Sequence, residues 1–150
     1  MKDVVTSYLN RRVEWEERGF TRIRICRWLV HDSQRDKYDT SLMELYPTED
    51  MIRNPDQFET RDDWVKAYTK EILGKLDPQE FYNSLPDKCV LMCHEKTEKD
   101  GSVHCHRRIV ADWLFLHLDV LVPEWLPSEQ KEELDRAKRQ TEFLNSELEF

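Results

Sequence analysis

The chain lacks long apolar segments and has no apolar stretch at its start of the kind that directs secretion. A membrane-spanning helix needs about 20 consecutive apolar residues, and no apolar run in the sequence approaches that length. The first residues, Met1-Lys2-Asp3-Val4-Val5, also lack the apolar segment of a signal peptide. The sequence therefore predicts a cytoplasmic protein without a membrane segment. Because thiols stay reduced in the cytoplasm, we expect the four cysteines to be reactive or core residues rather than disulfides.

An excess of positive charge is also missing, because 23 Lys and Arg stand against 31 Asp and Glu, for a net charge of -8. Proteins that coat nucleic acid along its phosphates usually carry the opposite balance. The composition therefore disfavours non-specific DNA or RNA binding. It leaves room for a small anionic ligand, since a few residues set the charge of a pocket.

The apolar residues present are sufficient for one folded domain. A length of 150 residues, a hydrophobic fraction of 39% and five Trp support a single core. We predict a compact three-layer α/β domain over residues 1–126, with a small, mainly parallel sheet flanked by helices. Residues 127–150 form a charged helical extension, which we expect to pack on the body; a partner-binding helix is the alternative.

Periodicity places the elements of this domain. Strands are expected over 20–30, 89–93 and 120–122, and 3–9 fits either a strand or a first helical turn. Helices are expected over 60–76, 77–85 and 107–118. The segment from Cys89 to Cys93 is apolar throughout, which is typical of a strand covered on both faces.

Reactive side chains gather in two short segments, Cys93-His94-Glu95 and His104-Cys105-His106-Arg107-Arg108. The expected strand ends at Cys93 and the expected helix begins near Cys105, and ligands of α/β sheets bind where strands lead into helices. A helix N-terminus attracts anions and lowers the pKa of a nearby thiol. We therefore predict that Cys105 is a nucleophile. Cys93 fits a nucleophile and a core thiol equally well on this pattern, whereas Cys26 and Cys89 are expected to be core thiols.

The charged residues next to these cysteines suggest how the site would work. We expect Glu95 to act as a general acid or base, or to orient an arginine. Arg107 and Arg108 suit a carboxylate or phosphate, since guanidinium groups bind both through paired hydrogen bonds. His106 is expected to help bind the same anion.

Zinc is the competing interpretation, because Cys93, His94, His104, Cys105 and His106 offer sulfur and nitrogen ligands. The spacing argues against it. Eleven residues separate the two cysteines without a Cys-x-x-Cys pair, and three consecutive side chains cannot all point at one ion. We therefore predict no resident cofactor, with a structural zinc site as the alternative.

The motifs Cys93-x-Glu95 and Cys105-His106-Arg107, followed by the segment 109–114, resemble the centre of the domain of unknown function 488 family. Further resemblances lie at 25–27, 45–48 and 68–73, so the similarity extends over residues 4–124. It implies a compact α/β domain with an enzyme-like cysteine site. It also adds Arg27 and Tyr68 as predicted ligand-binding residues, although Tyr68 fits the core equally well.

These observations together predict a cysteine-dependent enzyme that acts on a small anionic substrate, such as a nucleotide or a sugar phosphate. The nucleophile is Cys105 or Cys93, with Glu95 as acid or base. A non-catalytic module that sequesters the same ligand is the alternative, followed by an interaction protein with structural zinc.

Overall fold

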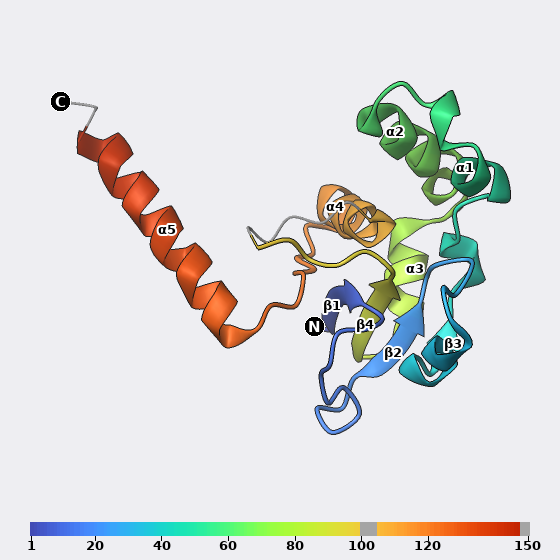
Figure 1. Ribbon diagram of the computed structural model, residues 1–150, viewed down its shortest axis with the longest axis horizontal. Helices are drawn as coiled ribbons and strands as arrows, with labels where there is room; N and C mark the ends of the chain where they lie inside the picture. Colours follow the sequence, from blue (N-terminus) through green and yellow to red (C-terminus); the bar gives the residue numbers. More distant parts are fainter. Residues whose placement is uncertain (100–104, 148–150) are drawn as a thin grey trace.

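The computed structural model describes residues 1–99 and 105–147. Its strands are β1 (Asp3–Tyr8), β2 (Thr21–Arg24), β3 (Thr40–Ser41) and β4 (Lys88–Cys93), which form one parallel sheet in the order β1-β4-β2-β3 (Figure 1). Its helices are α1 (Glu49–Arg53), α2 (Arg61–Glu71), α3 (Pro78–Ser84), α4 (His106–Leu118) and α5 (Ser128–Glu147). The predicted compact α/β fold with a small parallel sheet and a C-terminal helix is confirmed.

Strand β4 is the centre of the sheet, because β1 pairs with one of its edges and β2 with the other. Its apolar run from Cys89 to Cys93 is fully buried, as expected for a strand covered on both faces. Cys93 stands opposite Tyr8, and Met92 opposite Arg24. The segments that follow these three strands therefore start at the same edge of the sheet, where the candidate site lies.

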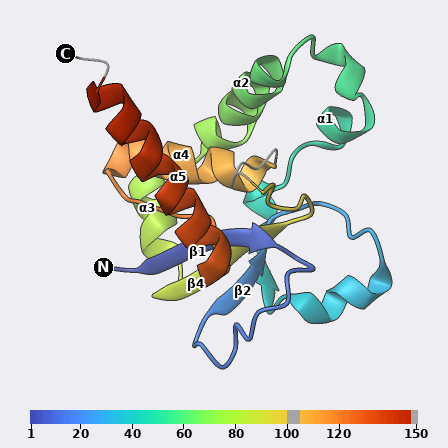
Figure 2. The same ribbon diagram turned by 60° about the vertical axis from the view of Figure 1, so that its left-hand side comes forward.

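Helix α4 packs against β1 and β4 and also contacts α2 and α3 (Figure 2). It buries Ile109, Val110, Trp113 and Leu114, which recur on one face at the helical period. The helix begins one residue after Cys105, so the core contacts of α4 fix the position of that cysteine.

Two expected elements differ in the structure. The strand predicted over 20–30 ends at Arg24, because the chain then bends and the Arg24 guanidinium binds the carbonyl of Cys26 at 2.7 Å. The strand predicted over 120–122 is wrong, since these residues form no strand and an isolated bridge follows only at Glu124, which pairs with Thr6. Pro123 lacks the N–H group that a continuous ladder would need.

Helix α5 projects from the body, and nearly all its described side chains are exposed (Figure 1). Gln130 links it to the loop after β4 by donating to the carbonyls of Glu98 and Lys99 at 2.9 and 3.1 Å. The expected packing of this helix on the body is therefore not found, because its apolar stripe is too sparse to cover a core surface. Within the described part of the chain, no helix has the length and apolarity that a bilayer crossing requires.

Candidate functional site

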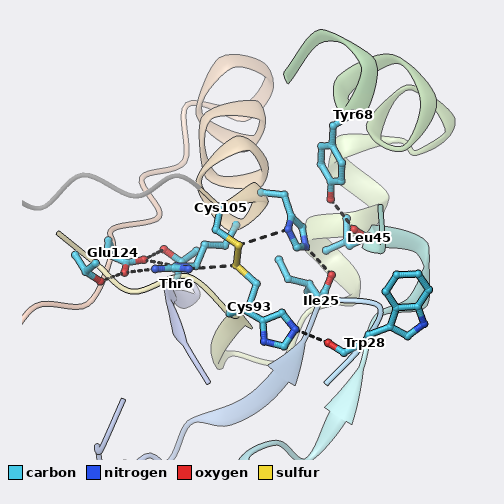
Figure 3. The surroundings of a disulfide bond; sticks show 12 residues. Thr6, Ile25, Trp28, Leu45, Tyr68, Cys93, Cys105 and Glu124 are labelled. Atoms are coloured by element: carbon cyan, nitrogen blue, oxygen red, sulfur yellow. Dashed lines mark hydrogen bonds and ion pairs between the residues drawn. A yellow bond between two sulfur atoms is a disulfide. The ribbon is translucent and has the colours of Figure 1, made fainter. Parts of the chain in front are cut away.

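Cys93 and Cys105 are joined by a disulfide at the carboxyl edge of the sheet (Figure 3). Cys93 is the last residue of β4, and Cys105 is the N-cap residue of α4. Because the strand end and the helix start converge, the two Cα atoms lie only 6.9 Å apart. The expectation that all the cysteines stay reduced is thus wrong for this pair, whereas Cys26 and Cys89 are free and buried as predicted.

The two bonded cysteines differ in access. Cys105 is 8% exposed and lines a pocket of about 280 Å³. Cys93 is 0% exposed. Of the two bonded cysteines, Cys105 is therefore the one that a reagent in the pocket can approach.

The ring of His106 lies beside Cys105, with its Nδ1 atom 3.6 Å from the sulfur. Its Nε2 atom is 2.6 Å from the carbonyl oxygen of Ile25. A carbonyl oxygen only accepts, so Nε2 carries the proton and Nδ1 of the neutral ring presents its lone pair to the sulfur. Burial, together with the nearby charge of Arg107, lowers the pKa of His106 to about 4. At neutral pH the ring of the oxidised protein is therefore uncharged, with its Nδ1 lone pair beside the sulfur of Cys105.

Arg107 belongs to the other side of the disulfide. Its Nε and Nη2 atoms donate to the two carboxylate oxygens of Glu124, each at 2.9 Å, and its Nη1 atom donates to the sulfur of Cys93 at 3.2 Å. The side chain is 0% exposed. The structure therefore places this guanidinium against Cys93 and Glu124 rather than in the pocket, where a ligand anion was predicted to meet it.

Glu124 completes a buried polar network with Thr6 and Thr97 (Figure 3). Burial opposes its charge, but the hydrogen bonds and the positive charge of Arg107 outweigh that effect and lower the pKa of the Glu124 carboxyl. Arg108 joins the network by donating to the Thr6 hydroxyl at 2.9 Å. Glu124 belongs to none of the motifs that the sequence indicated, although a lone acid between Pro123 and Trp125 in an apolar segment is a usable signal.

The pocket beside Cys105 combines apolar walls with basic groups. The walls include Trp28, Pro47, Met51, Ile52, Pro55 and Trp64. Arg27, Arg61 and His94 add basic nitrogen atoms, and the exposed Glu95 stands at the rim. The structure thus brings the predicted residues Arg27, Glu95, Cys105 and His106 to one pocket. It adds Arg61, whose place in the first turn of α2 gave no sign of this role.

Tyr68 lies in the core and not in the pocket wall. Its hydroxyl donates to the carbonyl of Leu45 at 2.6 Å, and burial raises the pKa of that hydroxyl. Its ring lies 5.4 Å from the ring of His106 (Figure 3). Tyr68 therefore supports His106 by packing.

Three of the residues considered as zinc ligands lie close together in the structure. Cys93, Cys105 and His106 bring ligand atoms within 4.8 Å of one another. Zinc binds thiolates, and the sulfurs of a disulfide are not thiolates, so the oxidised site does not fit the ion. His94 bonds to the carbonyl of Trp28, and His104 lies outside the described residues.

Comparison with known proteins gives no match: no family model, no curated protein and no solved structure matches the chain. The resemblance to the domain of unknown function 488 family therefore stays a prediction. Any function assigned to the chain rests on the geometry around Cys105.

Proposed function

We propose that the protein is a cysteine-dependent cytoplasmic enzyme that acts on a small anionic substrate, with reduced Cys105 as its nucleophile. One observation carries this proposal. Cys105 lines the pocket together with His106, and its sulfur lies 3.6 Å from the Nδ1 atom of that ring. A nucleophilic cysteine needs access to substrate and a base within reach, and Cys105 has both.

The chemistry begins when reduction of the disulfide frees the Cys105 thiol. His106 accepts the thiol proton on Nδ1, because the adjacent negative charge of the thiolate favours the protonated ring that burial disfavours in the oxidised protein. The N-terminus of α4 also stabilises the thiolate through its free N–H groups. The thiolate then attacks the electrophilic atom of the substrate, and the leaving group departs with its electron pair. His106 returns its proton to the leaving group. Glu95, which lines the same pocket, is the proposed base that takes a proton from a water molecule, and this water attacks the same substrate atom and releases Cys105.

The side chains of the pocket indicate the substrate class. The rings of Trp28 and Trp64 suit a flat or apolar portion, and the guanidinium groups of Arg27 and Arg61 suit an anionic group. Arg27 is held at the wall by its hydrogen bond to the carbonyl of Pro47, at 2.8 Å. This combination favours a phosphorylated metabolite, such as a nucleoside monophosphate or a sugar phosphate.

The test is to incubate the reduced protein with a panel of nucleoside monophosphates and sugar phosphates and to follow their conversion. We expect Cys105→Ser to abolish conversion while the substrate still binds by calorimetry. Cys89→Ala, which changes a buried thiol of the same strand as Cys93, is the matched control and should retain turnover. Binding without conversion by the unmodified protein would instead define a module that sequesters its ligand.

A further inference from the structure

The bonded pair supports a second activity besides the one proposed above. We propose that the protein catalyses thiol–disulfide exchange with small anionic disulfides, with Cys105 as the attacking cysteine and Cys93 as the resolving cysteine. This inference shares the nucleophilic Cys105 with the proposed function. It requires no phosphorylated substrate.

Access distinguishes the two roles. An attacking cysteine must meet the substrate, and Cys105 lines the pocket. A resolving cysteine must be reached by the attacking sulfur, and Cys93 is fully buried and bonded to Cys105. The disulfide in the structure is the product that such a pair would leave at the end of one half-cycle.

The group beside each sulfur suits the step in which that sulfur attacks. The lone pair of His106 lies beside Cys105 and takes up a proton in the first step. The guanidinium of Arg107 keeps its positive charge at any physiological pH and donates a hydrogen bond to Cys93 at 3.2 Å. Paired contacts to Glu124 hold Arg107 in that position. The thiolate of Cys93 is thereby stabilised for the second step.

The cycle balances in atoms and electrons. The Cys105 thiolate attacks one sulfur of the substrate disulfide and forms a mixed disulfide, and the first substrate thiol leaves with the proton from Cys105. The Cys93 thiolate then attacks the sulfur of Cys105 and releases the second substrate thiol with the proton from Cys93. The protein dithiol loses two electrons, and the substrate disulfide gains two electrons and two protons. A cellular thiol reductant regenerates the dithiol.

Basic residues at the pocket define the preferred disulfide. Arg27 and Arg61 line the space in front of Cys105, and His94 lies in the same wall. The two guanidinium groups favour disulfides that carry carboxylates. Glutathione disulfide has that chemistry and a small size, so it is the probe for the test.

The experiment mixes reduced full-length protein with glutathione disulfide and stops the reaction with acid. The remaining thiols are then alkylated, and each adduct is located by mass spectrometry. We expect the unmodified protein to form the Cys93–Cys105 disulfide with only a transient adduct. Cys93→Ser should accumulate glutathione on Cys105. Cys105→Ser should react at least a hundredfold more slowly, and Cys89→Ala should behave like the unmodified protein.

Two results would overturn the inference. One is a Cys93→Ser protein that gains no adduct at Cys105, and the other is a Cys105→Ser protein that reacts at Cys93 at the original rate. If either variant fails to fold, the site of the earliest adduct on the unmodified protein decides, with Cys105 expected and Cys93 contradictory. Exchange without turnover of phosphorylated metabolites supports this inference against the proposed function, and the reverse result overturns this inference alone.

Discussion

The two halves of the cysteine pair lie in different surroundings. Cys105 faces a pocket and has the neutral ring of His106 as its neighbour. Cys93 is closed off from solvent and has the charged guanidinium of Arg107 as its neighbour. The first arrangement provides access and proton transfer, and the second provides fixed charge and position. One disulfide thus joins an open, reactive side of the site to a closed, structural side.

The two sides also carry their charges differently. On the closed side, Arg107 and Glu124 are both ionised, because each supplies the counter-charge that the other needs when buried. On the open side, burial keeps His106 uncharged. Loss of a charge on the closed side is therefore expected to lower stability at neutral pH. Loss of the ring on the open side is expected to slow the reaction of Cys105 and to change how stability depends on pH.

The largest expected effect on stability comes from Glu124→Gln, which leaves Arg107 buried without a counter-charge. We expect the free energy of unfolding to fall by about 3–5 kcal/mol. Urea unfolding at pH 7 under oxidising conditions measures it. Glu95→Gln, which changes an exposed acid at the pocket rim, is the matched control and should stay within about 0.5 kcal/mol. Equal losses for the two variants would remove the distinction between the closed and the open side.

A somewhat smaller effect is expected from the pH dependence of His106. Its pKa in the folded protein is about 4 against an ordinary value of 6.5, so the unfolded chain takes up the proton first as the pH falls. The contribution of His106 to the free energy of unfolding is therefore fully present above about pH 6.5. It is lost as the pH falls towards 4, which lowers the free energy of unfolding by roughly 3 kcal/mol.

The variant His106→Gln keeps a donor for the carbonyl of Ile25 and removes the titrating ring. Urea unfolding at pH 7, 5.5 and 4.5 should show a shallower loss of stability in this variant. Alkylation of Cys105 should also slow by about 10- to 100-fold, since the proton acceptor is gone. An unchanged slope between pH 6.5 and 4 would mean that the ring is not held neutral by burial.

The smallest effect is expected from Tyr68→Phe, which leaves the buried carbonyl of Leu45 without its donor. We expect a loss of about 1–2 kcal/mol in the free energy of unfolding. The alkylation rate of Cys105 should change less than threefold, because Tyr68 contacts His106 only by packing. A large fall in reactivity with unchanged stability would return Tyr68 to the ligand-binding role that the sequence predicted.

The sequence predicted those parts of the molecule that local pattern determines. The apolar run from Cys89 to Cys93 identified the central strand, and the periodic residues after Arg107 identified α4. Because strands of a parallel sheet lead into helices at one edge, this pattern alone was enough to bring Cys93 and Cys105 to the same place.

Long-range contacts account for the parts that could not be predicted. Glu124 and Thr6 are far apart in the chain. The apolar surroundings of Glu124 mark it as unusual, but they do not show that Thr6 and Arg107 are the residues that donate to it. Arg107 follows a helix start, where an anion-binding role is the usual expectation, yet the buried acid occupies its guanidinium. The disulfide likewise depends on the approach of two elements whose distance the loop length does not reveal.

The most direct test of the account is the rate of alkylation of each cysteine in the reduced, metal-free protein as a function of pH. We predict that Cys105 reacts first, with an apparent pKa below the ordinary thiol value of about 8.5. Cys89, whose pKa burial raises to about 12, and the other buried thiols should stay unlabelled until the protein unfolds. Labelling of Cys93 before Cys105, or no labelling of Cys105 in the folded protein, would contradict the assignment of Cys105 as the nucleophile.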